Sequence, residues 1–176
     1  CFGRASMGTI EEVQTLQLDP YTVGPLHPDA HSLAALQARA LLDSGKASER
    51  DIAQVVAKNR AAAKSNPDAL VSGDFDVDAL LADPYEASPL RTHAMPPITD
   101  GAAAIVIAAG DTAREACSKT GAKPVWIRGI EHRCESMSLG LRDLTTSTST
   151  RTSAQASGAL DGAIDFAEVH APYAHQ

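Results

Sequence analysis

The chain has 176 residues, of which 44% are hydrophobic and 21% are charged, so its composition is that of a globular protein and not of a disordered one. Its net charge of −7 and the absence of a basic stripe in the sequence argue against nucleic acid or an anionic membrane as the main partner. The longest apolar run, residues 102–109, has the size of a strand, whereas a membrane span needs about 20 residues.

The first part of the chain predicts a loop followed by a helix. Residues 1–8 have the pattern of the end of a strand and its exit, and residues 9–29, rich in proline, predict a long ordered loop of the kind that forms lids or binding loops. A helix is expected to start near Asp29, which can cap it, and to stop at Gly45. Its apolar positions at helical spacing are Leu33, Leu36, Ala40 and Leu41.

A second helix is expected to begin at Ser48, because Asp51 follows three residues later as in a capping box. It should end at Asn66-Pro67, because the residue before a proline disfavours the helical region. Its predicted apolar face consists of Ile52, Val55, Val56 and Ala63. Residues 67–99 are broken by several prolines and predict one short helix, Val77 to Ala82; this stretch is the expected domain junction.

Beyond the junction, strands and helices are expected to alternate. Strands are predicted at residues 103–108, 124–130 and 164–169, and Asp111 is expected to cap a helix that ends at Thr120. A segment rich in Thr and Ser leads into another expected helix, through Ser157. This alternation predicts an α/β protein with a mixed β-sheet covered by helices.

Three cysteines, Cys1, Cys117 and Cys134, are widely spaced. An odd, separated set does not suggest a disulfide framework, and no CxxC pair suggests zinc. Because free cysteine is usually a small buried hydrophobic residue, we expect structural roles for these side chains in preference to a nucleophilic one. The sequence therefore predicts a reducing, cytoplasmic setting and no metal site.

The last predicted strand leads into His170, Pro172 and Tyr173, in a loop broken by proline. A strand that delivers a His and a Tyr into such a loop is a common way of placing catalytic groups. Because the chain begins at Cys1 without a Met and stops at Gln176, soon after this loop, we expect it to be an internal segment of a larger enzyme.

Several stretches carry a family pattern in order along the chain: residues 31–39 with 54–60 and Asn66-Pro67, then Pro89-Leu90 with 97–104, then 165–170. Together they resemble the thiolase superfamily. That family has a similar helix pair ending in Asn-Pro, a Ser-Asp-Gly-Ala-Ala-Ala run that opens the first strand of its C-terminal domain, and a strand leading to an Asn-Glu-Ala-Phe or His-Asp-Cys-Phe motif. The most similar branch is that of the sterol-carrier-type thiolases and the bacterial thiolase-like proteins often named lipid-transfer proteins.

The resemblance implies a thiolase-like layered fold, of which this chain is a part. Residues 1–88 would be the end of the N-terminal domain plus the helical loop region, and residues 89–176 the first part of the C-terminal domain. In the family, a cysteine in the N-terminal half carries the acyl group, and a His and often a second Cys act as base and acid. These groups are expected outside this chain, so the segment alone should not perform a full thiolase cycle.

The resemblance also implies the site residues. His170 matches the first residue of the family's motif, which helps to form an oxyanion hole, and Tyr173 takes the place of the motif's Phe; both are the expected catalytic residues. The alternatives are a His satisfied by backbone and an aromatic that lines an acyl or pantetheine channel. The expected substrate-binding residues are Met95, Pro96 and Pro172. Pro96 stands where many thiolases have a Ser that contacts the pantetheine of coenzyme A, so that hydrogen bond would be missing.

Basic side chains gather on the second predicted helix: Lys58, Arg60 and Lys64. They are candidates for the phosphates of coenzyme A, although a solvated face balanced by nearby acids is the preferred interpretation. The histidines of the proline-rich loops, His27 and His93, are expected to be structural or solvent-facing. The role of His175 stays open, and a solvated loop histidine is the default expectation.

For the whole protein, the resemblance implies a thiolase-like acyl-CoA acyltransferase of the acetyl-CoA acetyltransferase type, acting on lipid or steroid-derived thioesters. Coenzyme A thioester would be the substrate, with no covalently bound cofactor. Two alternatives stay open, a coenzyme-A-thioester retro-aldolase of steroid side-chain degradation on the same fold and a non-catalytic partner subunit. The resemblance further implies a homo-oligomer and a small partner protein with an OB-fold and a zinc ribbon.

Overall fold

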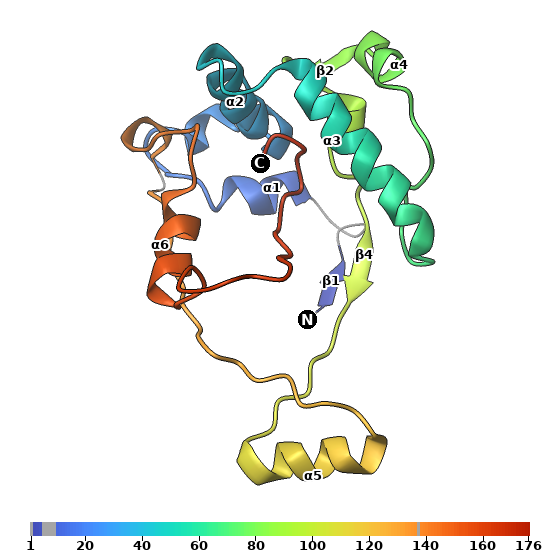
Figure 1. The fold of residues 1–176 in the computed structure, drawn as a ribbon. Coiled ribbons are helices and arrows are strands. Elements are labelled where there is room, and N and C mark those ends of the chain that lie inside the picture. The colour runs from blue at the N-terminus through green and yellow to red at the C-terminus, as the bar shows by residue number, and fades with distance from the viewer. Residues whose placement is uncertain (1, 5–9, 137) are drawn as a thin grey trace. The chain divides into compact units, whose positions relative to one another are not determined.

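The computed structural model describes residues 2–4, 10–136 and 138–176 (Figure 1). The chain forms two compact units and passes between them repeatedly. The first unit consists of Cys1–Gly8, Ile98–Cys134 and Thr148–Asp165, and the second of Thr9–Pro97, Glu135–Ser147 and Phe166–Gln176. The domain boundary implied by the resemblance, between residues 88 and 89, stays a prediction.

The second unit is built around two capped helices, α2 (Ala30–Asp43) and α3 (Glu49–Ala62). Asp29 caps α2, because its carboxylate accepts the backbone N–H of Ser32 at 2.6 Å. Ser48 and Asp51 form a reciprocal capping box at the start of α3. α3 passes into a 3₁₀ turn, η2 (Ala63–Ser65), and Asn66 before Pro67 is extended. The predicted helix starts and the predicted stop before the proline are confirmed.

The buried face of α2 is made of alanines and not of leucines. Ala34, Ala35 and Ala38 are buried, whereas Leu36 is 53% exposed, so the prediction that Leu36 faces the core is wrong. α2 packs against the β2–β3 hairpin described below, and small side chains let a helix approach its neighbour closely. On α3 the predicted Ile52 and Val56 are buried together with Ala53, while Val55 lies outside the core.

Shorter elements complete the second unit. The prediction of a loop is wrong at residues 10–15, which form a helix, α1 (Ile10–Thr15), and a 3₁₀ turn, η1 (Gly24–Leu26), lies further along the same stretch. α4 (Val77–Ala82) has the predicted bounds. It is followed by the antiparallel hairpin of β2 (Tyr85–Ala87) and β3 (Leu90–Arg91), in which Tyr85 stands opposite Arg91. The remaining 3₁₀ turns are η3 (Thr92–Ala94) and η4 (Leu139–Leu141).

The core of the second unit joins its helices to the C-terminal segment. One cluster of buried side chains consists of Ala34, Ala35, Ala38, Ile52, Leu90, Ala94 and Tyr173. A smaller cluster contains Ala53, Val56 and Leu80. The backbone N–H of Ala174 donates to the carbonyl of Ala94 at 3.3 Å, which fixes the C-terminal segment against η3. Residues far apart in sequence thus meet beside α2 and α3.

The first unit contains a two-stranded antiparallel ladder and two helices. β1 (Phe2–Arg4) pairs with β4 (Asp100–Ala102), with Gly3 opposite Gly101. α5 (Gly110–Thr120) ends at Gly121, whose φ of 71° is the left-handed conformation that glycine tolerates. Asp111 is not its cap, since the N-cap residue is Ala109 and Asp111 pairs with Arg114 at 2.7 Å. α6 (Thr148–Ala156) occupies the Thr- and Ser-rich region where a helix was expected.

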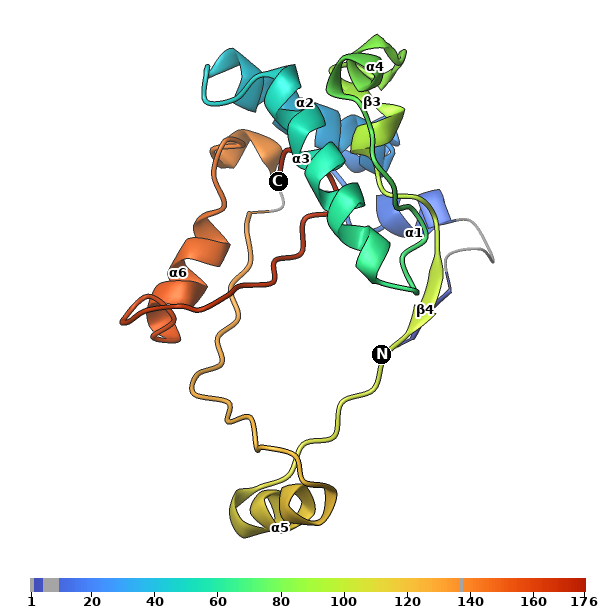
Figure 2. The same ribbon diagram turned by 45° about the vertical axis from the view of Figure 1, so that its right-hand side comes forward.

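The three strands predicted at residues 103–108, 124–130 and 164–169 are not strands in the described part of the chain. The segments on both sides of α5 run as irregular chain and are not assigned to a strand among the described residues (Figure 2). Their apolar side chains are exposed, Val106 by 95% and Val125 by 94%. A strand needs hydrogen bonds from a neighbouring strand, which local composition cannot supply. The fold is therefore mixed helix and sheet, as an α/β class requires, but the expected layered sheet is reduced in the described residues to two short ladders.

Within the residues that the structure describes, none of the helices is both long and apolar enough to cross a membrane.

Candidate substrate groove

A groove of about 310 Å³ lies in the second unit, between α3, η3 and the C-terminal segment. Apolar side chains and prolines make up most of its walls. Among the described residues, the guanidinium of Arg60 and the imidazole of His93 also line it. Its lining residues are Val56, Asn59, Arg60, Leu70, Val71, His93, Ala94, Met95, Pro96, Pro97, Ala171, Pro172 and Ala174. A largely apolar groove with a few polar groups is typical of small-molecule sites.

The residues expected to line the substrate come together in this groove. Met95 and Pro96 follow η3, while Pro172 belongs to the C-terminal segment, and all three line the same space. The hydrogen bond between Ala174 and Ala94 holds the two segments side by side. Their contact with a substrate stays a prediction, but their shared position is a property of the fold.

Arg60 is fixed at the wall of the groove by its neighbours. Its Nη2 donates to the carbonyl of His93 at 3.1 Å, and its guanidinium carbon lies 4.7 Å from the centre of the Phe75 ring. Lys64 pairs with Asp74 at 2.7 Å, as expected for a face balanced by acids, and Lys58 is exposed. Arg60 is therefore a positioned cation rather than a free one.

His93 is buried, with 7% of its surface exposed, and its Nδ1 lies 3.2 Å from a carboxylate oxygen of Asp83. The backbone carbonyl of His93 also accepts the hydrogen bond from Arg60. His93 therefore connects the groove wall to Asp83, in the loop before β2. This agrees with the structural role expected for it. His27, by contrast, is exposed and closes η1 in a left-handed conformation with φ of 45°.

His170 is exposed and lies one residue before Ala171, which lines the groove. The strand that was expected to carry it is absent, so its backbone is not fixed by a ladder. His170 is not itself among the groove's lining residues. The predicted catalytic role of His170 stays a prediction.

Tyr173 lies in the core, 8% exposed, and not in the groove. Its hydroxyl is 3.0 Å from Nδ1 of His31, and the two rings meet edge to face with centroids 5.8 Å apart. Burial, and then the negative charge of Asp29, raise the pKa of the Tyr173 phenol. These contacts give Tyr173 a packing role. Its predicted catalytic role stays a prediction: Met95 packs against the same buried cluster, but Tyr173 is not among the lining residues of the groove and borders a second cavity instead.

His175 is half-buried, and the expectation of a solvated loop histidine is wrong. Both ring nitrogens are buried and have no hydrogen-bond partner in the described ranges. Burial lowers the pKa of this imidazole, because a charged ring would lose its hydration. Its ring centroid lies 6.0 Å from that of Tyr173. The sequence held no signal for this environment other than the neighbouring Tyr173.

The cysteines differ in exposure. Cys117 is half-buried in α5, whereas Cys134 is exposed, with its Sγ 4.0 Å from Nε2 of His132, so the expected burial is wrong for Cys134. Cys1 lies outside the described residues. In the part of the chain that the structure covers, no group of three or more His, Cys, Asp or Glu side chains is placed to hold a metal ion.

The chain was compared with protein-family models and with known proteins. No protein-family model matches the chain. The chain is similar to an acetyl-CoA acetyltransferase from Methanothermobacter thermautotrophicus, with 29% identity over 144 residues. The matched region covers 79% of this chain but 37% of the relative, so the chain spans little more than a third of that protein.

This likeness agrees with the resemblance of the chain to the thiolase superfamily. It gives no support to the sterol-carrier branch, and none to a lipid or steroid substrate.

Proposed function

We propose that the chain is part of a thiolase-like acyl-CoA acyltransferase, and that the groove receives the pantetheine arm of a coenzyme A thioester. The observation that carries this proposal is the meeting of Met95 and Pro96 with Pro172 in one apolar groove. The similarity to an acetyl-CoA acetyltransferase supports the class of reaction.

The groove suits a thin, partly apolar arm. Val56, Leu70 and Met95 offer apolar surface, and Asn59 offers an amide that can pair with an amide of the arm. Arg60 supplies positive charge at the wall, held in place by His93 and Phe75. In the proposal, the thioester lies near Ala171.

His170 directly precedes Ala171 in the sequence, so in this proposal it is the candidate donor to the carbonyl oxygen of the thioester. An imidazole N–H directed at the thioester oxygen would stabilise the negative charge that develops there when an enolate forms. The proposal assigns the acyl-carrying cysteine and the acid–base pair to residues outside this chain. A lipid or steroid-derived thioester, a homo-oligomer, an OB-fold partner and a cytoplasmic setting belong to the same proposal.

The test is thiolysis of acetoacetyl-CoA by the full-length protein that contains this chain. His170→Ala should lower kcat by about a hundredfold with little change in KM, because an oxyanion donor acts in the transition state. His27→Ala, at another exposed histidine, is the matched control and should leave both constants unchanged.

A second variant tests the groove itself. Met95→Trp should raise KM for the thioester at least tenfold by filling the space, whereas Leu26→Trp, at a side chain that is 77% exposed, should not. Circular dichroism checks that each variant folds. Unchanged constants in both His170→Ala and Met95→Trp would refute the proposal, and so would carbon–carbon cleavage without a requirement for free coenzyme A, which is the retro-aldolase outcome. Lack of any activity with coenzyme A thioesters is the outcome of a non-catalytic subunit.

A further inference from the structure

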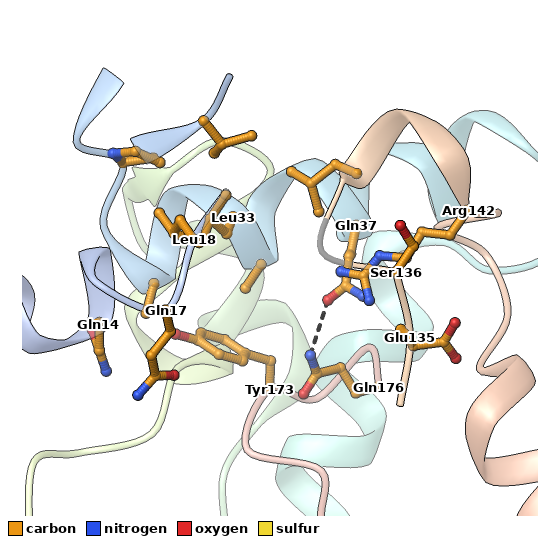
Figure 3. A pocket seen from close by; sticks show the side chains of 15 residues that line it. Gln14, Gln17, Leu18, Leu33, Gln37, Glu135, Ser136, Arg142, Tyr173 and Gln176 are labelled. Atoms are coloured by element: carbon orange, nitrogen blue, oxygen red, sulfur yellow. Dashed lines mark hydrogen bonds between the residues drawn. The ribbon is translucent and has the colours of Figure 1, made fainter. Parts of the chain in front are cut away.

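A second cavity, of about 410 Å³, lies in the second unit and has no part in the function proposed above (Figure 3). It is formed by α1 and the loop after it, the first half of α2, residues 135–136 and 138–142, and the end of the C-terminal segment. Its volume falls in the range of about 300–1,000 Å³ that small-molecule sites occupy. Leu18, Val23, Leu33 and Leu139 give it an apolar wall.

Glutamine carboxamides form much of the polar lining. Gln14, Gln17, Gln37 and Gln176 all border the cavity. The Nε2 of Gln176 donates to Oε1 of Gln37 at 3.0 Å, a contact drawn in Figure 3. Each carboxamide has two donor hydrogens and an oxygen with two lone pairs, so this one bond leaves capacity for a ligand that carries an amide.

Arg142 is the cation of the cavity, and it is incompletely paired. Its Nε is buried and has no hydrogen-bond partner among the described residues. Figure 3 shows its guanidinium on the side of Gln37, and both residues line the cavity. A buried donor on a charged group is costly to leave unpaired. The two terminal nitrogens of the Arg142 guanidinium form a planar fork that fits a carboxylate through two parallel hydrogen bonds.

The other charged lining residue is Glu135. It has an interaction of its own, and its carboxylate points away from Gln37 in Figure 3. Because Glu135 is engaged elsewhere and points away, Arg142 is the charge that meets a ligand beside Gln37, and one cation matches a ligand with one carboxylate.

We propose that this cavity binds small monocarboxylates that carry one amide and a branched apolar group, the chemical class of N-acyl amino acids. The carboxylate pairs with Arg142, the amide with Gln37 and its neighbours, and the apolar group packs on Leu18 and Leu33. This site does not depend on the coenzyme A groove, which has a different set of lining residues.

The test is calorimetric titration of the full chain with N-acetyl-L-leucine and with its neutral analogue N-acetyl-L-leucinamide. The acid should bind at least about tenfold more tightly than the amide, as expected for a charge-assisted pair. Arg142→Gln should abolish this preference, and Arg142→Lys, which keeps the charge but loses the fork, should reduce it. Arg151→Gln, at an exposed arginine of α6, is the matched control and should preserve it.

Equal binding of the acid and the amide, or no binding of either, by the unaltered protein would overturn the proposal. A preference for the acid that survives in Arg142→Gln would do the same. If Arg142→Gln does not fold, the comparison of the two compounds on the unaltered protein still decides, together with Gln37→Leu, which should weaken both.

Discussion

Two leucine truncations of identical chemistry should have very different effects on stability. Leu90 has no exposed surface and packs in the cluster that holds Tyr173. Leu90→Ala removes side-chain carbons worth about 0.8 kcal/mol each, roughly 2.4 kcal/mol in all. The cavity left behind raises the expected loss to about 3–4 kcal/mol. Leu36 is 53% exposed, so Leu36→Ala forfeits about half of that transfer energy, roughly 1 kcal/mol at most, and alanine's higher helix propensity returns a few tenths.

Urea unfolding followed by circular dichroism measures both losses, with a shared m value converting the shift in midpoint into a free energy. We expect Leu90→Ala to cost at least twice as much as Leu36→Ala. Equal losses would refute the burial on which the alanine face of α2 rests. A larger loss for Leu36→Ala would instead support the prediction from helical periodicity that Leu36 faces the core.

Three further outcomes are expected. Ala38→Leu, although it makes α2 more hydrophobic, should destabilise the protein by about 1–3 kcal/mol because Ala38 is fully buried, and urea midpoints would show it. Ser48→Ala should cost about 1 kcal/mol through loss of the capping box, with the nearby exposed Ser65→Ala as a control that leaves the urea midpoint nearly unchanged. Because the pKa of His175 is lowered in the folded state, its contribution to stability is fully present above the unfolded pKa of about 6.5 and is lost as pH falls through the lower folded pKa. His175→Gln should remove that slope from unfolding midpoints measured between pH 8 and 5, and an unchanged slope would contradict the burial of the ring.

Features set by neighbouring residues could be predicted from the sequence. The caps at Asp29 and Ser48 and the bounds of α4 depend on side chains within a few positions of the backbone groups they satisfy. The stop before Pro67 depends on the proline ring alone. Each of these signals is complete within one turn of helix, so no knowledge of the tertiary structure is required.

Features set by distant residues could not be predicted. Residues 103–108 have the composition of a buried strand, but a strand exists only beside another strand, and the sequence does not say which. The inward face of α2 is decided by how closely β3 approaches, not by the hydrophobicity of Leu36. The coupling of Tyr173 to His31 joins segments from opposite ends of the chain, and no local pattern indicates it.

The candidate groove lies between these two cases. Met95, Pro96 and Pro172 were selected because the chain resembles a family, and they meet where the backbone of Ala174 bonds to that of Ala94. His170 was selected in the same way, but residues 164–169 do not form the expected strand. No ladder therefore fixes the direction of the His170 side chain. The cavity at Arg142 has no counterpart in any sequence motif, because its lining residues come from three separate stretches of the chain.

The irregular segment before α5 has a consequence for the behaviour of the protein in solution. Residues 104–108 contain Ile105, Val106 and Ile107, exposed by 86%, 95% and 75%, with no charge and no proline among them. Short segments of this kind stack in register into cross-β fibrils when they meet copies of themselves. Turbidity and thioflavin fluorescence should therefore rise with protein concentration, and a single charge at Val106, as in Val106→Lys, should act as a gatekeeper that delays the rise.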